Sequence, residues 1–253
     1  NKKMLLIVLA ARLAGIKKVF ISVQNVIYSK SKLQILKIKI LFQILNKLKV
    51  FFVPASKSIL NSMINLNINY KNYKIIYNSC DVESIQKIIK KERDNNSSNN
   101  FKTVTMIARL DHIKDQETLI RAFAKLNFLD WRLKIVGKGP QFEFLKKIAK
   151  SLGLPNKIFY GERSDVLKIL SETDIFAFST TETEGFGKVL IEAMASDLPI
   201  IASDVSACRE ILFNGKGGIL VPPGDINEWT RNLKKLIKDK KKRKIIAEKA
   251  FLY

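Results

Sequence analysis

Apolar and polar positions alternate in blocks that predict strands and helices in turn along most of the chain. Short apolar runs predict buried strands, and the longer mixed runs between them predict helices. From Phe101 onward the two kinds of run alternate at the spacing of a parallel sheet with crossover helices. The predicted strands there are residues 103–108, 133–136, 174–178, 199–203 and 217–221, and the predicted helices are residues 115–126, 188–195, 207–212 and 225–238. This part of the chain is therefore predicted to be an α/β domain.

The first eighty residues predict further strands and helices. The strands are expected at residues 18–23, 50–55 and 74–77, and the helices at residues 3–14, at residues 31–49 and from Ser56 onward. The helix at 31–49 is apolar over much of its surface and carries five lysines. Two interpretations stay open. It packs on a sheet like an ordinary Rossmann helix, or it lies on a membrane interface, where lysine side chains extend around an apolar face.

Charge is distributed unevenly along the chain. Residues 1–80 contain 14 lysines and arginines and no aspartate or glutamate, whereas the whole chain has a net charge of +22. A block this basic suits an anionic surface, either a membrane or a nucleic acid. The lysine-rich composition encoded by an AT-rich genome is an alternative explanation. We expect peripheral contact of the N-terminal block with an anionic membrane, and we expect no nucleic acid partner.

A polar stretch divides the chain. Residues 91–100 (KERDNNSSNN) contain no apolar side chain and are typical of a linker. We therefore expect one domain at residues 1–90 and another at residues 101–253.

Residue counts exclude several kinds of site. His112 is the single histidine, no Asp-x-Asp occurs, and the two cysteines, Cys80 and Cys208, are far apart in the sequence. Neither a histidine-ligated metal site nor a disulfide framework fits these counts. We expect no metal, no cofactor and a reducing compartment. The expected location is cytoplasmic, with peripheral attachment to the inner face of the cytoplasmic membrane as an open alternative.

Residues 181–195 (TETEGFGKVLIEAMA) place a glycine-containing loop between a predicted strand and a predicted helix. Gly185 and Gly187 allow the backbone to approach a ligand closely, and the first N–H groups of the helix favour an anion. Glu184 precedes the helix and Glu192 lies within it, so an anion at the helix start would have a carboxylate on each side. A sugar–diphosphate–ribose ligand presents hydroxyls, phosphates and hydroxyls in that order. For Glu192, simple pairing with a nearby lysine is an equal alternative.

Two cations follow the predicted strand at residues 103–108. Arg109 stands at its carboxyl end, where parallel sheets bind ligands, and Lys114 follows five residues later. Two cations at this edge suit a diphosphate, with a surface ion pair as the alternative.

Two further candidates rest on weaker patterns. Gly137 opens a G-x-G after the strand at residues 133–136, which is too short for a phosphate-binding P-loop. Arg163 lies in the loop that ends another predicted strand near Phe159, where Ser164 or Asp165 is expected to cap a helix.

Six ordered blocks carry a family resemblance: IARLDHIKD, LKIVGKGP, FYGERSDV, EGFGKVLIEAMA, LPIIASDVSACREIL and GGILVPPGD. Together they resemble the retaining glycosyltransferases of family four, the glycosyl transferases group 1, over residues 74–238. The resemblance implies the α/β GT-B fold with two Rossmann-like lobes, the C-terminal lobe complete and the N-terminal lobe partial. The family's glycine-rich first loop and its N-domain histidine have no counterpart here, where the comparable stretch reads Val23-Gln24-Asn25. We therefore expect an N-terminally truncated chain.

The resemblance also implies a reaction. It is metal-independent, retaining transfer of a sugar from a nucleotide-sugar donor, with UDP favoured, to a glycan or lipid-linked acceptor in bacterial polysaccharide or lipopolysaccharide biosynthesis. Arg109 and Lys114 match the residues that hold the diphosphate, Glu184 matches the residue that holds the sugar hydroxyls, and Glu192 the residue that holds the ribose. The candidate catalytic residues are Glu184, Arg109 and Lys114, and the candidate donor-binding residues are Gly185, Phe186, Gly187, Lys188, Glu192, Gly137 and Arg163.

Three alternatives stay open. The first is a truncated, catalytically inactive fragment that still binds a nucleotide-sugar. The second is a basic nucleic-acid-binding protein, which only the charge supports. The third is another sugar-nucleotide enzyme of the same fold, such as an epimerase.

Overall fold

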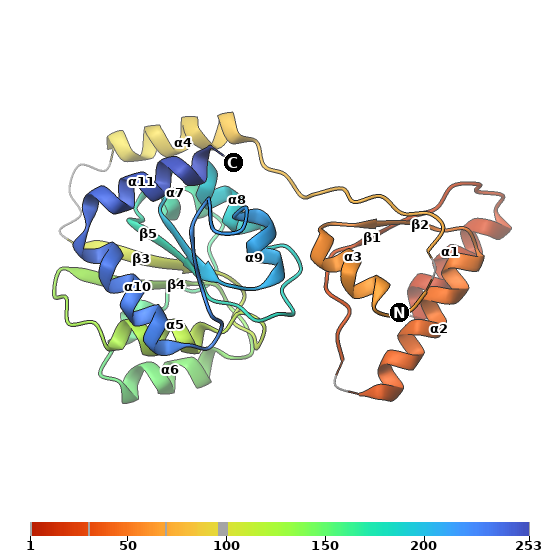
Figure 1. The fold of residues 1–253 in the computed structure, drawn as a ribbon, viewed down its shortest axis with the longest axis horizontal. Coiled ribbons are helices and arrows are strands. Elements are labelled where there is room, and N and C mark those ends of the chain that lie inside the picture. The colour runs from red at the N-terminus through yellow and green to blue at the C-terminus, as the bar shows by residue number, and fades with distance from the viewer. Residues whose placement is uncertain (1, 30, 69, 96–100, 253) are drawn as a thin grey trace. The chain divides into compact units, whose positions relative to one another are not determined.

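The computed structural model describes residues 2–29, 31–68, 70–95 and 101–252, and the chain forms two compact units (Figure 1). Unit 1 is Asn1–Asn78 and unit 2 is Ser79–Tyr253. Within the described residues, each unit has a parallel sheet of its own, with two strands in unit 1 and five in unit 2.

The described part of unit 1 contains a short parallel sheet and three helices. Its elements are α1 (Lys2–Leu13), β1 (Phe20–Val23), α2 (Lys32–Lys47), β2 (Phe51–Pro54) and α3 (Lys57–Ile64). Ser56 caps α3 by accepting a hydrogen bond from the Ile59 N–H at 3.1 Å, so the predicted helix start is confirmed. The strand predicted at residues 74–77 is wrong. The segment lies along β2, with the Lys74 and Ile76 N–H groups donating to the carbonyls of Phe52 and Pro54, but the isolated bridge described here is at Tyr73, just before it.

The core of unit 1 explains how α1 and α2 are held. Phe42 and Leu45 of α2 pack with Phe52 and Tyr70, so α2 has the sheet-packed inner face of a Rossmann helix. The Arg12 guanidinium of α1 donates to the carbonyls of two residues that follow α2, Leu48 and Lys49.

Unit 2 alternates strands and helices as predicted. Its elements are α4 (Val82–Asn95), β3 (Lys102–Ile107), α5 (Gln116–Ala124), β4 (Trp131–Val136), α6 (Phe142–Ser151), the 3-10 turn η1 (Asn156–Ile158), α7 (Val166–Ser171), β5 (Ile175–Phe178), α8 (Lys188–Ala195), β6 (Ile200–Ser203), α9 (Ser206–Ile211), β7 (Ile219–Val221), α10 (Ile226–Lys238) and α11 (Lys240–Phe251). The parallel sheet has the order β4-β3-β5-β6-β7. Beyond β4, the strand predicted near Phe159 is reduced to a single bridge with Ile135.

Two hydrophobic clusters cover the two faces of this sheet. Along β5, Ile175 and Ala177 belong to one cluster, whereas Phe176 and Phe178 belong to the other, as the two-residue period of a strand requires. Helices α5, α6 and α10 cover the first face, and α4, α7, α8, α9 and α11 contribute to the second. A parallel sheet buried on both faces explains why its strands are continuous apolar runs in the sequence.

The structure places the boundary between the units earlier than the expected linker. Unit 2 begins at Ser79, and α4 continues to Asn95, so residues 91–95 are helical and not linker. Ile85 and Ile89 are buried one turn apart, and the polar residues that follow only extend the exposed side of this helix. Arg93 then donates to the Ser196 carbonyl at 2.9 Å. Residues 96–100 lie outside the described residues.

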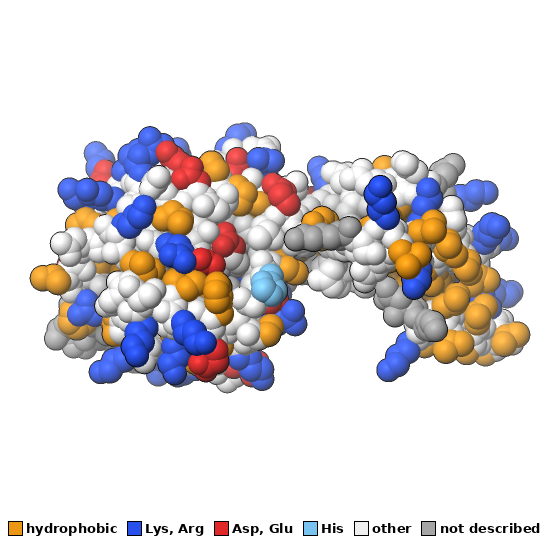
Figure 2. Space-filling model, turned by 90° about the horizontal axis from the view of Figure 1, so that it is seen from below, with side chains coloured by type: hydrophobic (Ala, Val, Ile, Leu, Met, Phe, Trp, Pro, Cys, Tyr) orange, Lys and Arg blue, Asp and Glu red, His pale blue; other side chains and the backbone are white. Residues whose placement is uncertain are grey.

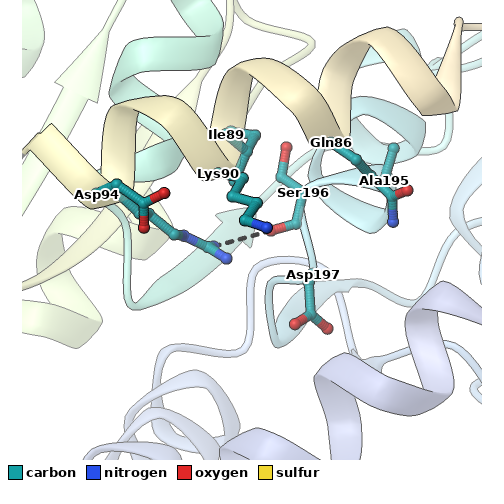
Figure 3. Close-up of a pocket in the computed structure, with 8 residues that line it drawn as sticks. Gln86, Ile89, Lys90, Asp94, Ala195, Ser196 and Asp197 are labelled. Carbon is teal, nitrogen blue, oxygen red and sulfur yellow. Dashed lines mark hydrogen bonds between the residues drawn. The ribbon is translucent and has the colours of Figure 1, made fainter.

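Figure 3 shows this contact at a surface hollow of about 400 Å³, lined by α4 and by Ala195, Ser196 and Asp197. The hollow lies at the C-terminal end of α8. It is therefore at the opposite end of this helix from the glycine-containing loop.

The basic run at residues 238–244 is not a uniformly solvated tail. It begins α11, which Asp239 caps by accepting a hydrogen bond from the Lys242 N–H. Arg243 is buried, donates to the carbonyls of Leu236 and Ile237, and lies over the ring of Trp131. This arginine therefore joins α11 to α10 and to the sheet.

Candidate functional site

The strand order of unit 2 has a switch point between β3 and β5, the place where open α/β sheets form a ligand-binding crevice. β3 and β5 are adjacent, but the chain leaves β3 toward β4 on one side and leaves β5 toward β6 on the other. The loops that follow β3 and β5 therefore diverge at the carboxyl ends of these strands, which is where open α/β sheets bind ligands. These two loops carry Arg109, Lys114 and Glu184.

Hydrogen bonds join the two loops. The Thr181 N–H donates to the Ile113 carbonyl at 2.8 Å, and the Thr180 hydroxyl lies 2.9 Å from the same carbonyl. The Thr180 N–H donates to the Ser203 hydroxyl at 2.8 Å, which ties the end of β5 to the end of β6. The floor of the crevice is therefore a bonded network.

Lys114 and Glu184 form an ion pair at the centre of this network. The Lys114 ammonium contacts the Glu184 carboxylate, and the two side chains are only 18% and 7% exposed. The Thr180 hydroxyl lies 3.1 Å from the same carboxylate oxygen, and the ring of Phe178 is centred 4.9 Å from the ammonium. The fold thus brings together two candidate catalytic residues that are 70 positions apart in the sequence.

Arg109 stands at the rim of the crevice. Its side chain is 70% exposed, and its Nε donates to the Asp111 carboxylate at 2.7 Å. The surface ion pair that the sequence left open is therefore present. Because the rest of the guanidinium faces water, it has further donors for a ligand.

Gly187 lets the chain turn sharply into α8. It is the N-cap residue with φ +79°, in the left-handed region, and a Cβ there would lie 3.2 Å from the ring of Phe178. The helix begins at Lys188, which confirms the predicted start. The Leu190 N–H donates to the Gly187 carbonyl at 2.8 Å, and no side chain caps the helix, so the N–H groups of Lys188 and Val189 are the ones suited to an anion.

Phe186, the aromatic between the two glycines, is buried in the hydrophobic cluster that includes Leu190. Its ring therefore belongs to the core. Gly185 next to it is also buried.

Glu192 has the partner that the sequence left as an alternative. Its carboxylate lies 3.5 Å from the ammonium of Lys188, one turn earlier on α8, and its side chain is about one fifth exposed. Val189 and Ile191 of the same helix are only half-buried, so this almost wholly apolar helix is not buried on all sides. The contact with ribose hydroxyls stays a prediction.

Gly137 serves a close backbone approach after β4. Its φ is +142°, and a Cβ there would lie 2.0 Å from the Ala108 carbonyl oxygen. A Cβ on Gly139 would lie 2.2 Å from the Leu110 carbonyl oxygen. These glycines let the loop after β4 pack against the backbone of residues 108–110, the segment that carries Arg109.

Replacing Gly137 with alanine is expected to lower the free energy of unfolding of unit 2 by more than about 2 kcal/mol. The added Cβ would overlap the Ala108 carbonyl, and the backbone at residue 108 and at residue 137 cannot shift without disturbing the strands that precede them. Gly153→Ala is the matched control. Gly153 also has a positive φ, +74°, but a Cβ there would meet nothing within 4 Å, so we expect a loss of about 1 kcal/mol. Urea unfolding of the two variants measures the difference. Equal losses would contradict the close approach.

Arg163 is engaged within its own loop. It donates two hydrogen bonds to the Asp165 carboxylate at 2.8 and 2.6 Å, and this contact lowers the pKa of Asp165 to about 2. The expected side-chain cap by Asp165 is therefore wrong: Asp165 occupies the N-cap position of α7 but makes no capping hydrogen bond. The assignment of Arg163 to the donor stays a prediction.

The sequence reasoning missed Thr180, Ser203 and Asp115. Thr180 lies two residues after the fully buried strand β5, and Ser203 is the last residue of the fully buried strand β6. A hydroxyl at the carboxyl end of a buried parallel strand could have indicated both. Asp115 follows Lys114 with φ +39°, a left-handed conformation that is uncommon for aspartate, and burial raises the pKa of its carboxyl. Of the three, Thr180 contacts the Glu184 carboxylate, and Ser203 holds the Thr180 backbone.

Within residues 2–95 and 101–252, apart from residues 30 and 69, no three histidine, cysteine, aspartate or glutamate side chains lie close enough to hold a metal ion. In the same part of the chain, no helix combines the length and the apolar character needed to cross a membrane. Metal-independent transfer stays a prediction.

The chain is similar to known proteins over most of its length. A family model described as glycosyl transferases group 1 matches residues 87–252. The chain is 31% identical over 252 residues to the N-acetylgalactosamine-N,N'-diacetylbacillosaminyl-diphospho-undecaprenol 4-alpha-N-acetylgalactosaminyltransferase of Campylobacter jejuni, a match that covers 96% of this chain and 67% of that protein. It is 28% identical over 200 residues to the N-acetyl-alpha-D-glucosaminyl L-malate synthase of Bacillus anthracis, covering 78% of this chain and 52% of that protein.

The fold is also found in solved structures. The Anabaena protein HepE, in complex with UDP and glucose, has a TM-score of 0.87 at 23% identity, covering 99% of this chain and 70% of that one. This chain spans about two thirds of the length of the Campylobacter enzyme and about half of the length of the Bacillus enzyme. The family match over residues 87–252 and the 31% identity over nearly the whole chain show that it belongs to the glycosyl transferases group 1, with a Rossmann-like α/β fold of the GT-B type.

Proposed function

We propose that unit 2 binds the donor of a retaining glycosyltransferase reaction. The observation that carries this proposal is the contact of Lys114 with Glu184 at the carboxyl edge of the sheet, in the same loop network that leads into the first turn of α8. A cation, a carboxylate and free helix N–H groups in one crevice match a ligand in which a diphosphate joins a sugar.

The diphosphate occupies the first turn of α8, where the N–H groups and the helix dipole favour an anion. Lys114 and Arg109 add positive charge. In the free chain Lys114 contacts Glu184, so donor binding transfers the ammonium from the carboxylate to phosphate oxygens. Glu184 then accepts hydrogen bonds from the sugar hydroxyls and orients the ring.

The reaction breaks the bond between the anomeric carbon and the phosphate oxygen. The acceptor oxygen bonds to the anomeric carbon on the same face, and its proton passes to the oxygen of the leaving diphosphate. Negative charge grows on the diphosphate as this bond breaks, and Lys114, Arg109 and the α8 N–H groups stabilise that charge.

A UDP-sugar is the proposed donor, and a glycan or lipid-linked acceptor is proposed. HepE is similar in fold and is described in complex with UDP and glucose, while the similar Campylobacter enzyme is named for a diphospho-undecaprenol acceptor. A lipopolysaccharide core glycosyltransferase of Rhizobium meliloti is also similar, at 27% identity over 147 residues. These names support a role in polysaccharide, lipopolysaccharide or glycan synthesis.

Calorimetric titration with UDP, GDP and ADP tests the donor site. We expect micromolar binding of UDP, weakened about tenfold to a hundredfold by Arg109→Ala, since a charge-assisted hydrogen bond is worth roughly 1.5–3 kcal/mol. Arg231→Ala is the matched control, because Arg231 is also an exposed arginine paired with a nearby carboxylate, that of Glu228. Unchanged affinity in Arg109→Ala would remove its phosphate role, and failure of all three nucleotides to bind would contradict the donor site.

A further inference from the structure

The hydroxyl of Thr180 has one proton and two acceptors within reach. Thr180 lies in the loop that follows β5 and is fully buried. Its Oγ1 lies 2.9 Å from the Ile113 carbonyl oxygen and 3.1 Å from Oε2 of Glu184. Because a hydroxyl donates only one hydrogen bond at a time, Thr180 serves one of these oxygens and leaves the other to further donors.

Each of the two acceptors has another donor in the free chain. The Thr181 N–H donates to the Ile113 carbonyl at 2.8 Å. The Lys114 ammonium contacts Oε2 of Glu184, the same oxygen that the Thr180 hydroxyl approaches. The ammonium occupies that oxygen and neutralises its charge, so the hydroxyl donates to the carbonyl, which is also the nearer acceptor.

Withdrawal of the ammonium reverses this preference. The Glu184 side chain is almost fully buried, and its charge then lacks the cation that compensates it. A hydrogen bond to an ionised group is about twice as strong as one between neutral groups, and a buried charge without partners is costly. The Ile113 carbonyl keeps the Thr181 N–H in either case, so the hydroxyl can leave it without creating an unsatisfied buried acceptor.

The backbone around Thr180 holds its side chain within reach of both oxygens. The Thr180 N–H donates to the Ser203 hydroxyl at 2.8 Å, and Ser203 is itself fully buried at the end of β6. The Glu184 N–H donates to the Thr181 carbonyl at 3.0 Å, which closes a turn between the two residues. A change of acceptor therefore requires only that the hydroxyl hydrogen turns.

We propose that Thr180 is a positioning residue whose hydroxyl changes its acceptor from the Ile113 carbonyl to the Glu184 carboxylate when Lys114 is drawn away. In the reaction this step rests on the proposed function, because the donor phosphates are the groups that draw the ammonium from Glu184. The carboxylate then keeps a hydrogen bond donor, and with it its position, while the sugar binds. No covalent bond changes in this step.

The charge of the molecule favours withdrawal of the ammonium by an anion. The chain has 45 lysines and arginines against 23 aspartates and glutamates, and Figure 2 shows lysine and arginine side chains spread over the face of unit 2 that it displays. Such a field draws anionic ligands toward the protein. A neutral ligand, in contrast, would leave the ion pair of Lys114 with Glu184 intact.

Urea unfolding tests the proposal without any ligand, because Lys114→Met removes the ammonium permanently. We expect Thr180→Val, which removes the hydroxyl and keeps the shape, to lower the folding equilibrium constant about tenfold more in the Lys114→Met background than alone. The reason is that the hydroxyl donates to a charged group only in that background. Thr180→Ser keeps the hydroxyl and is expected to show little of this extra loss. Equal losses from Thr180→Val in the two backgrounds would mean that the hydroxyl donates to the carbonyl permanently, and the proposal would be wrong.

Titration with UDP applies the same reasoning to donor binding. Thr180→Val is expected to weaken UDP binding about tenfold, because UDP takes Lys114 from Glu184 and the carboxylate then lacks the hydroxyl as well. In the Glu184→Gln background, where there is no buried charge, the same change is expected to have little effect. Thr103→Val is the matched control, since Thr103 is also buried but donates to a backbone carbonyl, that of Glu172, at 2.8 Å.

The two experiments separate failure of this proposal from failure of the donor site. If the unchanged chain binds UDP and Thr180→Val binds it equally well, the change of acceptor is overturned and the donor site stands. If the unchanged chain binds no UDP, the donor site is contradicted, and the unfolding measurements decide the role of Thr180 by themselves.

Discussion

Replacing Glu184 with glutamine is expected to slow sugar transfer by about 10²–10³-fold while unit 2 stays folded. Glutamine has the size of glutamate and can still accept a hydrogen bond from Thr180, which lies 3.1 Å from the carboxylate. The change removes the negative charge that, in the proposed reaction, holds the sugar hydroxyls and faces the anomeric carbon as positive charge develops there. Release of UDP from a UDP-sugar under single-turnover conditions measures the chemical step.

The same variant is expected to bind UDP at least as tightly as the unchanged chain. Lys114 contacts Glu184 in the free chain, so loss of the carboxylate leaves the ammonium available to phosphate. Glu182→Gln is the matched control, because Glu182 is an exposed glutamate in the same loop, and it should leave both quantities unchanged. Normal transfer by Glu184→Gln would remove Glu184 from the mechanism, whereas a loss of UDP binding alone would assign it to the nucleotide.

The sheet of unit 2 could be predicted because its strands are buried on both faces. A run such as Ile175–Phe178 is apolar throughout, and the middle of a parallel sheet that is covered on both faces buries all four of its side chains. The apolar segments at residues 73–77 and near residue 159 lie beyond β2 and β4, where their described bridges are single ones, at Tyr73 and at Phe159. Whether an apolar run completes a regular ladder depends on its neighbour's length and twist, which the local pattern does not contain.

The position of the boundary between units required tertiary information. Residues 91–95 are polar and resemble a linker, yet they extend α4 because Ile85 and Ile89 fix the inner side of this helix and Arg93 binds the Ser196 carbonyl. A polar composition indicates that a segment faces water, but it does not distinguish a linker from the exposed side of a helix.

The candidate site could be predicted only in part, because some of its features are local in the sequence and others join distant residues. Local spacing identified Glu184, Gly187 and the start of α8, since a loop and a helix N-terminus are local features. The contact of Lys114 with Glu184 joins residues 70 positions apart and exists because β3 and β5 are neighbours in the sheet. The strand order, and with it the pairing of the two residues, could come only from the fold or from the family resemblance.

Replacing Lys114 with methionine is expected to lower the free energy of unfolding of unit 2 by about 2–4 kcal/mol. The Glu184 side chain is only 7% exposed, and without Lys114 its charge keeps only the Thr180 hydroxyl as a side-chain partner among the described contacts. Removing one member of a buried ion pair typically costs about 3–5 kcal/mol, and the 18% exposure of Lys114 places this pair toward the lower end of that range. Urea unfolding followed by a probe in unit 2 measures the loss.

The double variant Lys114→Met/Glu184→Gln is expected to recover most of this stability, because a neutral amide beside a thioether leaves no uncompensated charge in the crevice. Lys134→Met is the matched control. Lys134 pairs with Glu172 at 2.9 Å in the same unit, but Glu172 is more exposed and can be solvated when its partner is lost, so a smaller effect is expected. If Lys114→Met costs no more than Lys134→Met, or if the double variant recovers nothing, the ion pair does not hold Glu184 in place. If the single and double variants behave as expected, Lys114 holds the Glu184 carboxylate in place in the free chain. On donor binding, the phosphates would then replace Glu184 as the partner of Lys114.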